Sequence, residues 1–112
     1  MEKRHIGRSG LRVSTAGLGC NNFGWRIDQE ASNKVVAKAL DLGITLFDTA
    51  DRYGTSAGDS ELVLGKALGP RRKDIVLLSK FGVDLQNARI RDSSRHYIMN
   101  AVEGSLDRKS TV

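Results

Sequence analysis

The spacing of apolar residues along the chain switches between two patterns. Residues 4–14 form two short stretches around Ser9-Gly10, a turn signal that predicts a small β-hairpin. Beyond the hairpin, short apolar runs typical of strands alternate with longer segments whose apolar residues recur at helical spacing. The strand-like runs cover residues 15–19, 44–47 and 75–78.

Start and stop signals frame three predicted helices. The third helix places Ile98, Val102, Ser105 and Leu106 on one face. The signals are Asp28 and Gly43 for the first helix, Asp59-Ser60 and Gly69-Pro70 for the second, and Ser93 or Ser94 at the start of the third.

The order of elements is a hairpin followed by β-α-β-α-β-α, with strand centres about 30 residues apart, as in repeated βα units. This repeat predicts an α/β fold with a parallel sheet. The run 75–78 is continuously apolar, as expected of a strand that is buried on both faces. Eight such units make a TIM (β/α)8 barrel of about 250 residues. Because three units cannot close a barrel, we expect residues 1–112 to be the first part of a single larger domain.

Composition narrows the class of protein. The chain has 112 residues, a net charge of +5 and 39% hydrophobic residues. It has no apolar run long enough to span a membrane, and its N-terminus does not resemble a secretory signal. Its one cysteine excludes an internal disulfide and a multi-cysteine metal site, so a cytoplasmic location is expected. The basic residues are scattered and lack interleaved aromatic residues, which argues against a nucleic-acid partner.

Polar residues follow each predicted strand, at the edge where βα-repeat barrels carry their functional groups. Asp48 follows the run 44–47 and Lys80 follows 75–78, so parallel pairing would bring both to one edge. A carboxylate and an ammonium that are paired and partly buried hold each other ionised. Tyr53 lies on the loop beyond Asp48, where a neighbouring ammonium would make its phenol a better proton donor. Taken singly, each of the three also fits a structural role.

Other motifs are weaker. Gly17-Leu18-Gly19 begins like the dinucleotide-binding pattern G-x-G-x-x-G but lacks the third glycine, which argues against a Rossmann site. Cys20 is interpreted as a small buried residue, and a reactive thiol near the site is the alternative. Trp25 follows the first strand loop, where it could line a substrate pocket or pack on the surface.

One set of motifs is far more specific than these. It consists of residues 43–54, which include Asp48 and Tyr53, continued by 60–61, 64–68 and 75–80. In this combination the chain resembles the N-terminal part of an aldo-keto reductase, and the resemblance covers essentially the whole sequence.

The resemblance implies a TIM (β/α)8 barrel plugged by the N-terminal hairpin, of which this chain holds the first three βα units. It also implies an oxidoreductase that reduces an aldehyde or ketone with NADPH and needs no metal. Tyr53 would protonate the carbonyl oxygen, Lys80 would assist it, and Asp48 would hold Lys80. The implied site residues are Asp48, Tyr53 and Lys80 for catalysis; Gly19, Cys20, Asn21 and Asp48 for the cofactor; and Trp25 and Tyr53 for the substrate.

Alternatives stay open beside this hypothesis. The family's fourth catalytic residue, a histidine after the fourth strand, has no counterpart up to Val112, so we expect these 112 residues alone to be inactive. A non-catalytic, cofactor-binding regulatory subunit of the same fold could keep Asp48, Tyr53 and Lys80. An inert truncation product is a third hypothesis. The sequence does not identify the carbonyl substrate, choose NADPH over NADH, or give the oligomeric state.

Overall fold

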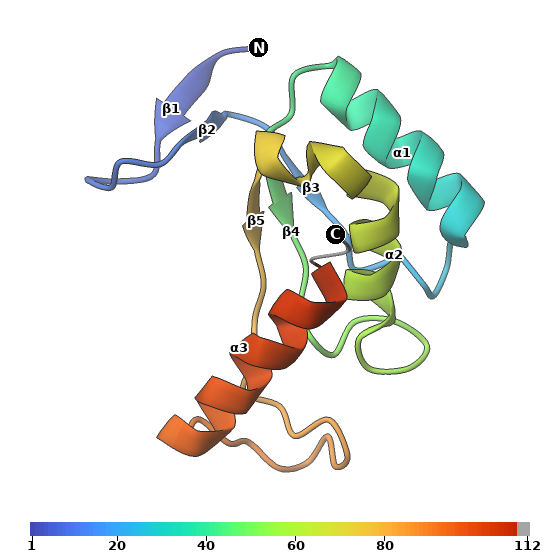
Figure 1. Ribbon diagram of the computed structural model, residues 1–112, viewed down its shortest axis with the longest axis vertical. Coiled ribbons are helices and arrows are strands. Elements are labelled where there is room, and N and C mark those ends of the chain that lie inside the picture. Colours follow the sequence, from blue (N-terminus) through green and yellow to red (C-terminus); the bar gives the residue numbers. More distant parts are fainter. Residues whose placement is uncertain (110–112) are drawn as a thin grey trace.

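The computed structural model describes residues 1–109 and shows the expected alternation of strands and helices (Figure 1). Within this range, none of the helices combines the length and the apolar character that crossing a bilayer requires. The elements are β1 (Lys3–His5), β2 (Arg12–Ser14), β3 (Gly17–Gly19), α1 (Gln29–Asp41), β4 (Leu46–Asp48), α2 (Asp59–Leu68), the 3-10 helix η1 (Gly69–Asp74), β5 (Val76–Leu78) and α3 (Arg95–Lys109).

The strands form two separate sheets, as predicted. β1 and β2 pair antiparallel as the N-terminal hairpin. β3, β4 and β5 form a parallel sheet in that order, with Gly19 opposite Asp48 and Asp48 opposite Leu78. Two hydrogen bonds between Ser14 and Thr45 attach the hairpin just ahead of β4, at the amino end of the sheet. The arrangement is a part of a βα-repeat fold and not a closed barrel.

The predicted helix signals are largely confirmed. The Asp28 carboxylate accepts a hydrogen bond from the backbone of Ala31 at 2.9 Å, and Gly43 follows α1 with a φ of +83° that favours glycine. The Ser94 hydroxyl caps α3 by accepting from the backbone N–H of Tyr97 at 3.2 Å. The chain beyond α2 was not predicted to be helical, yet it continues as η1, whose first turn tolerates Pro70.

Among the described residues, an apolar core lies between the parallel sheet and the helices α1 and α2. α2 contacts both α1 and α3, and Figure 1 shows it between the two. This core fixes α2 against the sheet, which matters below because the first turn of α2 reaches the strand ends. The buried members are Cys20, Phe23, Val36, Ala39, Phe47, Leu64, Leu68 and Ile75.

Two expectations about packing need correction. β5 was expected to be buried on both faces, but its side chains are half-buried, and Leu78 is 41% exposed. The reason is its place at an edge of the three-stranded sheet. On α3, the predicted face is also largely open. Val102 and Leu106 are exposed and Ile98 is half-buried, so Ser105 is the one member of that face that is buried.

α3 packs on α2 through a close backbone approach and polar contacts. A Cβ at Gly65 of α2 would lie 2.7 Å from the backbone oxygen of Arg108, so only glycine fits there. Next to this contact, Arg108 pairs with Glu61. The apolar spacing of α3 therefore does not reveal the side that packs on α2.

Candidate active site

The carboxyl ends of the three parallel strands bring the predicted site loops together. Hydrogen bonds continue the pairing beyond the strands: Cys20 N–H donates to Asp48 O at 2.8 Å, Thr49 N–H to Leu78 O at 2.9 Å and Asp51 N–H to Lys80 O at 3.1 Å. The expectation that the polar segments after the strands lie side by side is thus confirmed.

Lys80 and Asp48 form a close ion pair across the ends of β4 and β5. The Lys80 ammonium lies 2.8 Å from Oδ1 and 2.7 Å from Oδ2 of Asp48, and it also donates to the carbonyl oxygen of Thr49 at 2.9 Å. Burial acts to lower the pKa of Lys80, but the hydrogen bonds and charge of Asp48, together with Tyr53, outweigh it and raise that pKa. The lysine is therefore held as an ammonium in one place.

The ring of Tyr53 also lies close to the Lys80 ammonium. The Lys80 Nζ lies 5.2 Å from the centroid of the Tyr53 ring, and the ring is half-buried. The backbone around the ring is fixed, since Tyr53 N–H donates to Ala50 O and Ser60 N–H donates to Tyr53 O at 3.0 Å. The structure thus brings Asp48, Tyr53 and Lys80 together, as the sequence predicted.

A hollow opens beside Tyr53. It has a volume of about 330 Å³, within the range of small-ligand sites. Trp25 at its margin is 54% exposed, and the Arg26 guanidinium lies 4.3 Å from the centroid of its ring. Three residues predicted for cofactor or substrate therefore surround one space. The lining residues are Asn21, Trp25, Arg52, Tyr53 and Gly54.

Of the other predicted cofactor residues, Asp48 is the partner of Lys80 described above, and Gly19 and Cys20 differ in exposure. Gly19 is exposed, and the position of an added Cβ has open space around it. The Cys20 side chain is fully buried, and burial raises the pKa of its thiol to about 12. The interpretation of Cys20 as a small buried residue is confirmed. The residue as a whole is at 0% exposure, and both its N–H and its carbonyl oxygen are hydrogen-bonded within the protein, so the structure does not offer it to a cofactor as predicted.

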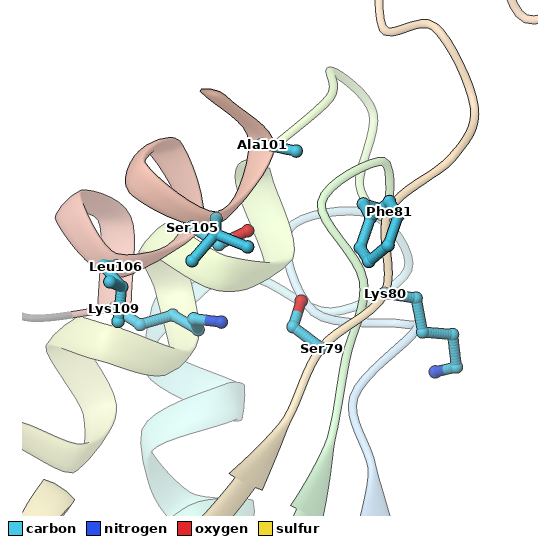
Figure 2. Close-up of a pocket in the computed structure, with 8 residues that line it drawn as sticks. Ser79, Lys80, Phe81, Ala101, Ser105, Leu106 and Lys109 are labelled. Atoms are coloured by element: carbon cyan, nitrogen blue, oxygen red, sulfur yellow. The ribbon is translucent and has the colours of Figure 1, made fainter. Parts of the chain in front are cut away.

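A second hollow, of about 230 Å³, lies between the end of β5 and α3. Figure 2 shows Ser79 pointing toward Ser105 and Lys109 of α3, whereas the neighbouring Lys80 points to the opposite side of the strand. Successive side chains of a strand alternate in this way. The end of β5 thus serves two sides, with Lys80 in the candidate site and Ser79 facing the helices.

A charged cluster that the sequence did not predict is buried on that helix-facing side. Glu61 is fully buried and pairs with Arg108 at 2.6 Å and Lys109 at 3.5 Å. Ser79 donates a hydrogen bond to Glu61 at 2.5 Å. Burial acts to raise the pKa of Glu61, but the hydrogen bonds from Ser79 and Arg108 outweigh it and lower that pKa. The one available signal was Glu61 itself, an acidic residue within the specific motif 60–61.

Asp51 is a buried carboxylate whose oxygens are not all hydrogen-bonded in the part of the chain that the structure describes. Its side chain is 2% exposed, and Oδ2 has no hydrogen-bond partner among the described residues. Burial first, and the charge of Glu61 second, raise the pKa of Asp51. Within residues 1–109, no group of three or more His, Cys, Asp or Glu side chains is arranged to hold a metal ion.

Replacing Asp51 by asparagine is expected to stabilise the protein at neutral pH. Because the folded-state pKa is raised, the stability tied to the protonated carboxyl is fully present below the unfolded pKa and is lost as pH rises through the folded pKa. Asp51→Asn should remove this loss and raise the free energy of unfolding at neutral pH by about 1 kcal/mol. Urea unfolding at a series of pH values from about 4 upward measures it.

Asp92→Asn is the matched control for this prediction. Asp92 accepts a hydrogen bond from Ser94 N–H at 2.8 Å, and this bond lowers its pKa. Its contribution to stability is present above the unfolded pKa and is lost as pH falls, so the two variants should change the pH dependence in opposite directions. Changes of the same sign would contradict the interpretation of Asp51.

Comparisons with known proteins agree with this geometry. The sequence model of the Aldo/keto reductase family matches residues 15–111. The chain is 38% identical to the uncharacterized oxidoreductase YrpG of Bacillus subtilis and 39% identical to YqkF of the same organism, with 99% of this chain covered in each case. It spans only 37% and 36% of their lengths.

Solved structures agree as well. The aldo-keto reductase AKR11C1 from Bacillus halodurans, in its holo form, superposes with a TM-score of 0.87 at 40% identity. The match covers 99% of this chain and 37% of that one. The predicted fold class, a partial TIM barrel with an N-terminal hairpin, is confirmed by this similarity together with the parallel sheet.

Proposed function

The chain belongs to the aldo/keto reductase family, and from this premise we propose that it forms part of the catalytic domain of an oxidoreductase that reduces an aldehyde or ketone with NADPH. The observation that carries the proposal is the contact of the Lys80 ammonium with both Asp48 and the Tyr53 ring. Residues 1–112 then contribute the proton donor and the groups that tune it, within one larger domain.

The proposed chemistry assigns one task to each side chain. When bound, the cofactor supplies a hydride to the carbonyl carbon of the substrate. The Tyr53 hydroxyl donates its proton to the carbonyl oxygen, which becomes the alcohol. The Lys80 ammonium stabilises the phenolate that the proton leaves behind, and Asp48 holds the ammonium by two hydrogen bonds.

The residues around the hollow fit the nicotinamide end of such a cofactor. Exposed Gly19 leaves its backbone open to a flat ring, and Asn21 offers an amide that can both donate and accept hydrogen bonds. Trp25 offers an exposed aromatic face to the substrate at the margin of the hollow. We therefore propose Gly19 and Asn21 as cofactor contacts and Trp25 as a substrate contact.

Titration of the protein at its natural length with NADPH tests this assignment. Saturable binding is expected, followed by the fluorescence of the dinucleotide. Asn21→Ala should weaken binding by about fivefold to tenfold, the effect of losing one hydrogen bond of about 1 kcal/mol. Asn33→Ala is the control, because Asn33 lies exposed on α1, where its side chain accepts a hydrogen bond from Gln29.

The outcomes separate the hypotheses. Absence of saturable binding of both NADPH and NADH, or equal effects of the two asparagine variants, would contradict the proposed cofactor site. Tighter binding of NADH than of NADPH would mean that the proposed site is correct and that its cofactor is NADH. Binding without turnover of any aldehyde or ketone would favour the non-catalytic subunit of the same fold.

A further inference from the structure

Two adjacent residues in the first turn of α2 contact the ends of all three parallel strands. The Ser60 hydroxyl donates to the carbonyl oxygen of Cys20, beyond β3, at 2.6 Å. The same hydroxyl lies 2.8 Å from the hydroxyl of Thr49, beyond β4. Glu61 accepts a hydrogen bond from Ser79, beyond β5, at 2.5 Å. A single dipeptide therefore links three segments that are far apart in sequence.

Most of the residues that make these contacts are inaccessible to solvent, and Ser79 is half-buried. Ser60, Glu61 and Thr49 are all fully buried, so their hydrogen bonds do not compete with water. Glu61 is charged, and its charge is balanced by Arg108 and Lys109 from the last turn of α3. The dipeptide thus contacts α3 on one side through the ion pairs of Glu61, and it contacts the strand ends on the other side through hydrogen bonds.

Two of the three residues that the side chains of the dipeptide contact beyond the strands are direct neighbours of candidate catalytic residues. Thr49 follows Asp48, and Ser79 precedes Lys80. Successive side chains of a strand point to opposite faces, and the pairing continues beyond the strands through Thr49 N–H to Leu78 O. Hydrogen bonds that fix the side chains of Thr49 and Ser79 on the helix-facing side of the sheet therefore also fix the orientation of the Asp48 and Lys80 side chains on the opposite side.

We propose that Ser60 and Glu61 are positioning residues of the candidate active site, which hold the Asp48–Lys80 pair in register from the opposite face of the sheet. This inference rests on the proposed function of that pair. Ser60 also fixes the proton donor, because its N–H donates to the carbonyl oxygen of Tyr53 at 3.0 Å. All three members of the site are thus tied to one turn of α2.

Reactivity of Lys80 tests the proposal without cofactor or substrate. Trace acetylation of the protein at its natural length, at neutral pH and quantified by mass spectrometry, compares Lys80 with the exposed Lys66 as internal standard. An ammonium that is hydrogen-bonded to Asp48 is protected from acetylation. Ser79→Ala and Ser60→Ala should loosen that pair and raise the ratio of Lys80 to Lys66 labelling by about threefold, within the strength of a partly exposed ion pair.

Ser32→Ala is the matched control. Ser32 is fully buried like Ser60, and its hydroxyl also donates to a backbone carbonyl, that of Asp28, at 2.6 Å. Both its hydroxyl and its N–H donate to Asp28 at the start of α1, away from the hydrogen bonds of Ser60 and Glu61, so its loss should lower stability and leave the Lys80 ratio unchanged. Ser79→Thr, which keeps the hydroxyl, should restore the protection of Lys80.

Two results would overturn the proposal: an unchanged Lys80 ratio in Ser79→Ala, or an equal rise in Ser32→Ala. Ser79 is only half-buried, so its alanine variant keeps the test valid even where Ser60→Ala fails to fold. Failure of NADPH binding or of carbonyl turnover would instead count against the proposed function, and it would leave the labelling result standing.

Discussion

Tyr53→Phe should lower kcat for carbonyl reduction by roughly 10²–10⁴-fold, the usual value of a general acid. The variant removes one oxygen and keeps the ring that lies 5.2 Å from the Lys80 ammonium, so packing and the Asp48–Lys80 pair should persist. Binding of NADPH should therefore change little, and the loss should fall on the chemical step. Steady-state kinetics of the protein at its natural length, with a panel of aldehydes and ketones, measures it.

The other tyrosine of the chain provides the control. The Tyr97 hydroxyl donates to the carbonyl oxygen of Val83 at 2.8 Å and does not take part in the candidate site. Tyr97→Phe should cost about 1 kcal/mol of stability and leave kcat near the wild-type value. A Tyr53→Phe enzyme with nearly full activity would mean that another group supplies the proton.

Glu61→Gln should be the most destabilising single substitution among the ion pairs of the described residues. It removes the charge that neutralises Arg108 and Lys109, of which Lys109 is 9% exposed and the glutamate 0%. Breaking a buried pair by removing one partner leaves an uncompensated charge, which costs about 3 kcal/mol or more. Urea unfolding followed by circular dichroism measures the loss.

The exposed pair of Arg71 and Asp74 gives the reference for this loss. Their side chains are 51% and 47% exposed at a separation of 3.5 Å. Asp74→Asn should change the free energy of unfolding by at most about 1 kcal/mol. If the two carboxylates give equal losses, the buried cluster does not hold α3 in the way described.

The elements could be predicted because their signals are local. Asp28, Gly43 and Ser94 act on the backbone within a few residues, and the sequence shows them directly. The parallel sheet followed from the regular spacing of the apolar runs. The exposure of β5 could not be predicted in the same way. An apolar run does not tell whether a strand lies at the centre or the edge of a sheet, and β5 lies at an edge.

The site was predictable for a related reason. Parallel pairing brings the residues after the strands together, so Asp48 and Lys80 could be placed side by side from topology alone. The buried cluster was not predictable in this way, because Glu61 and Arg108 are 47 residues apart and come from different helices. Charged residues on predicted helices are normally solvated, and only the packing of α3 on α2 removes these from water.

The buried Cys20 has a use beyond packing. It is the chain's one cysteine, it lies at 0% exposure, and its raised pKa keeps the thiol protonated. An alkylating reagent can modify it only when this corner of the core transiently opens, so the rate of labelling reports the free energy of that opening. The carbonyl oxygen of Cys20 accepts a hydrogen bond from Ser60 of α2. The rate at which the thiol is alkylated therefore measures how often α2 separates transiently from the sheet.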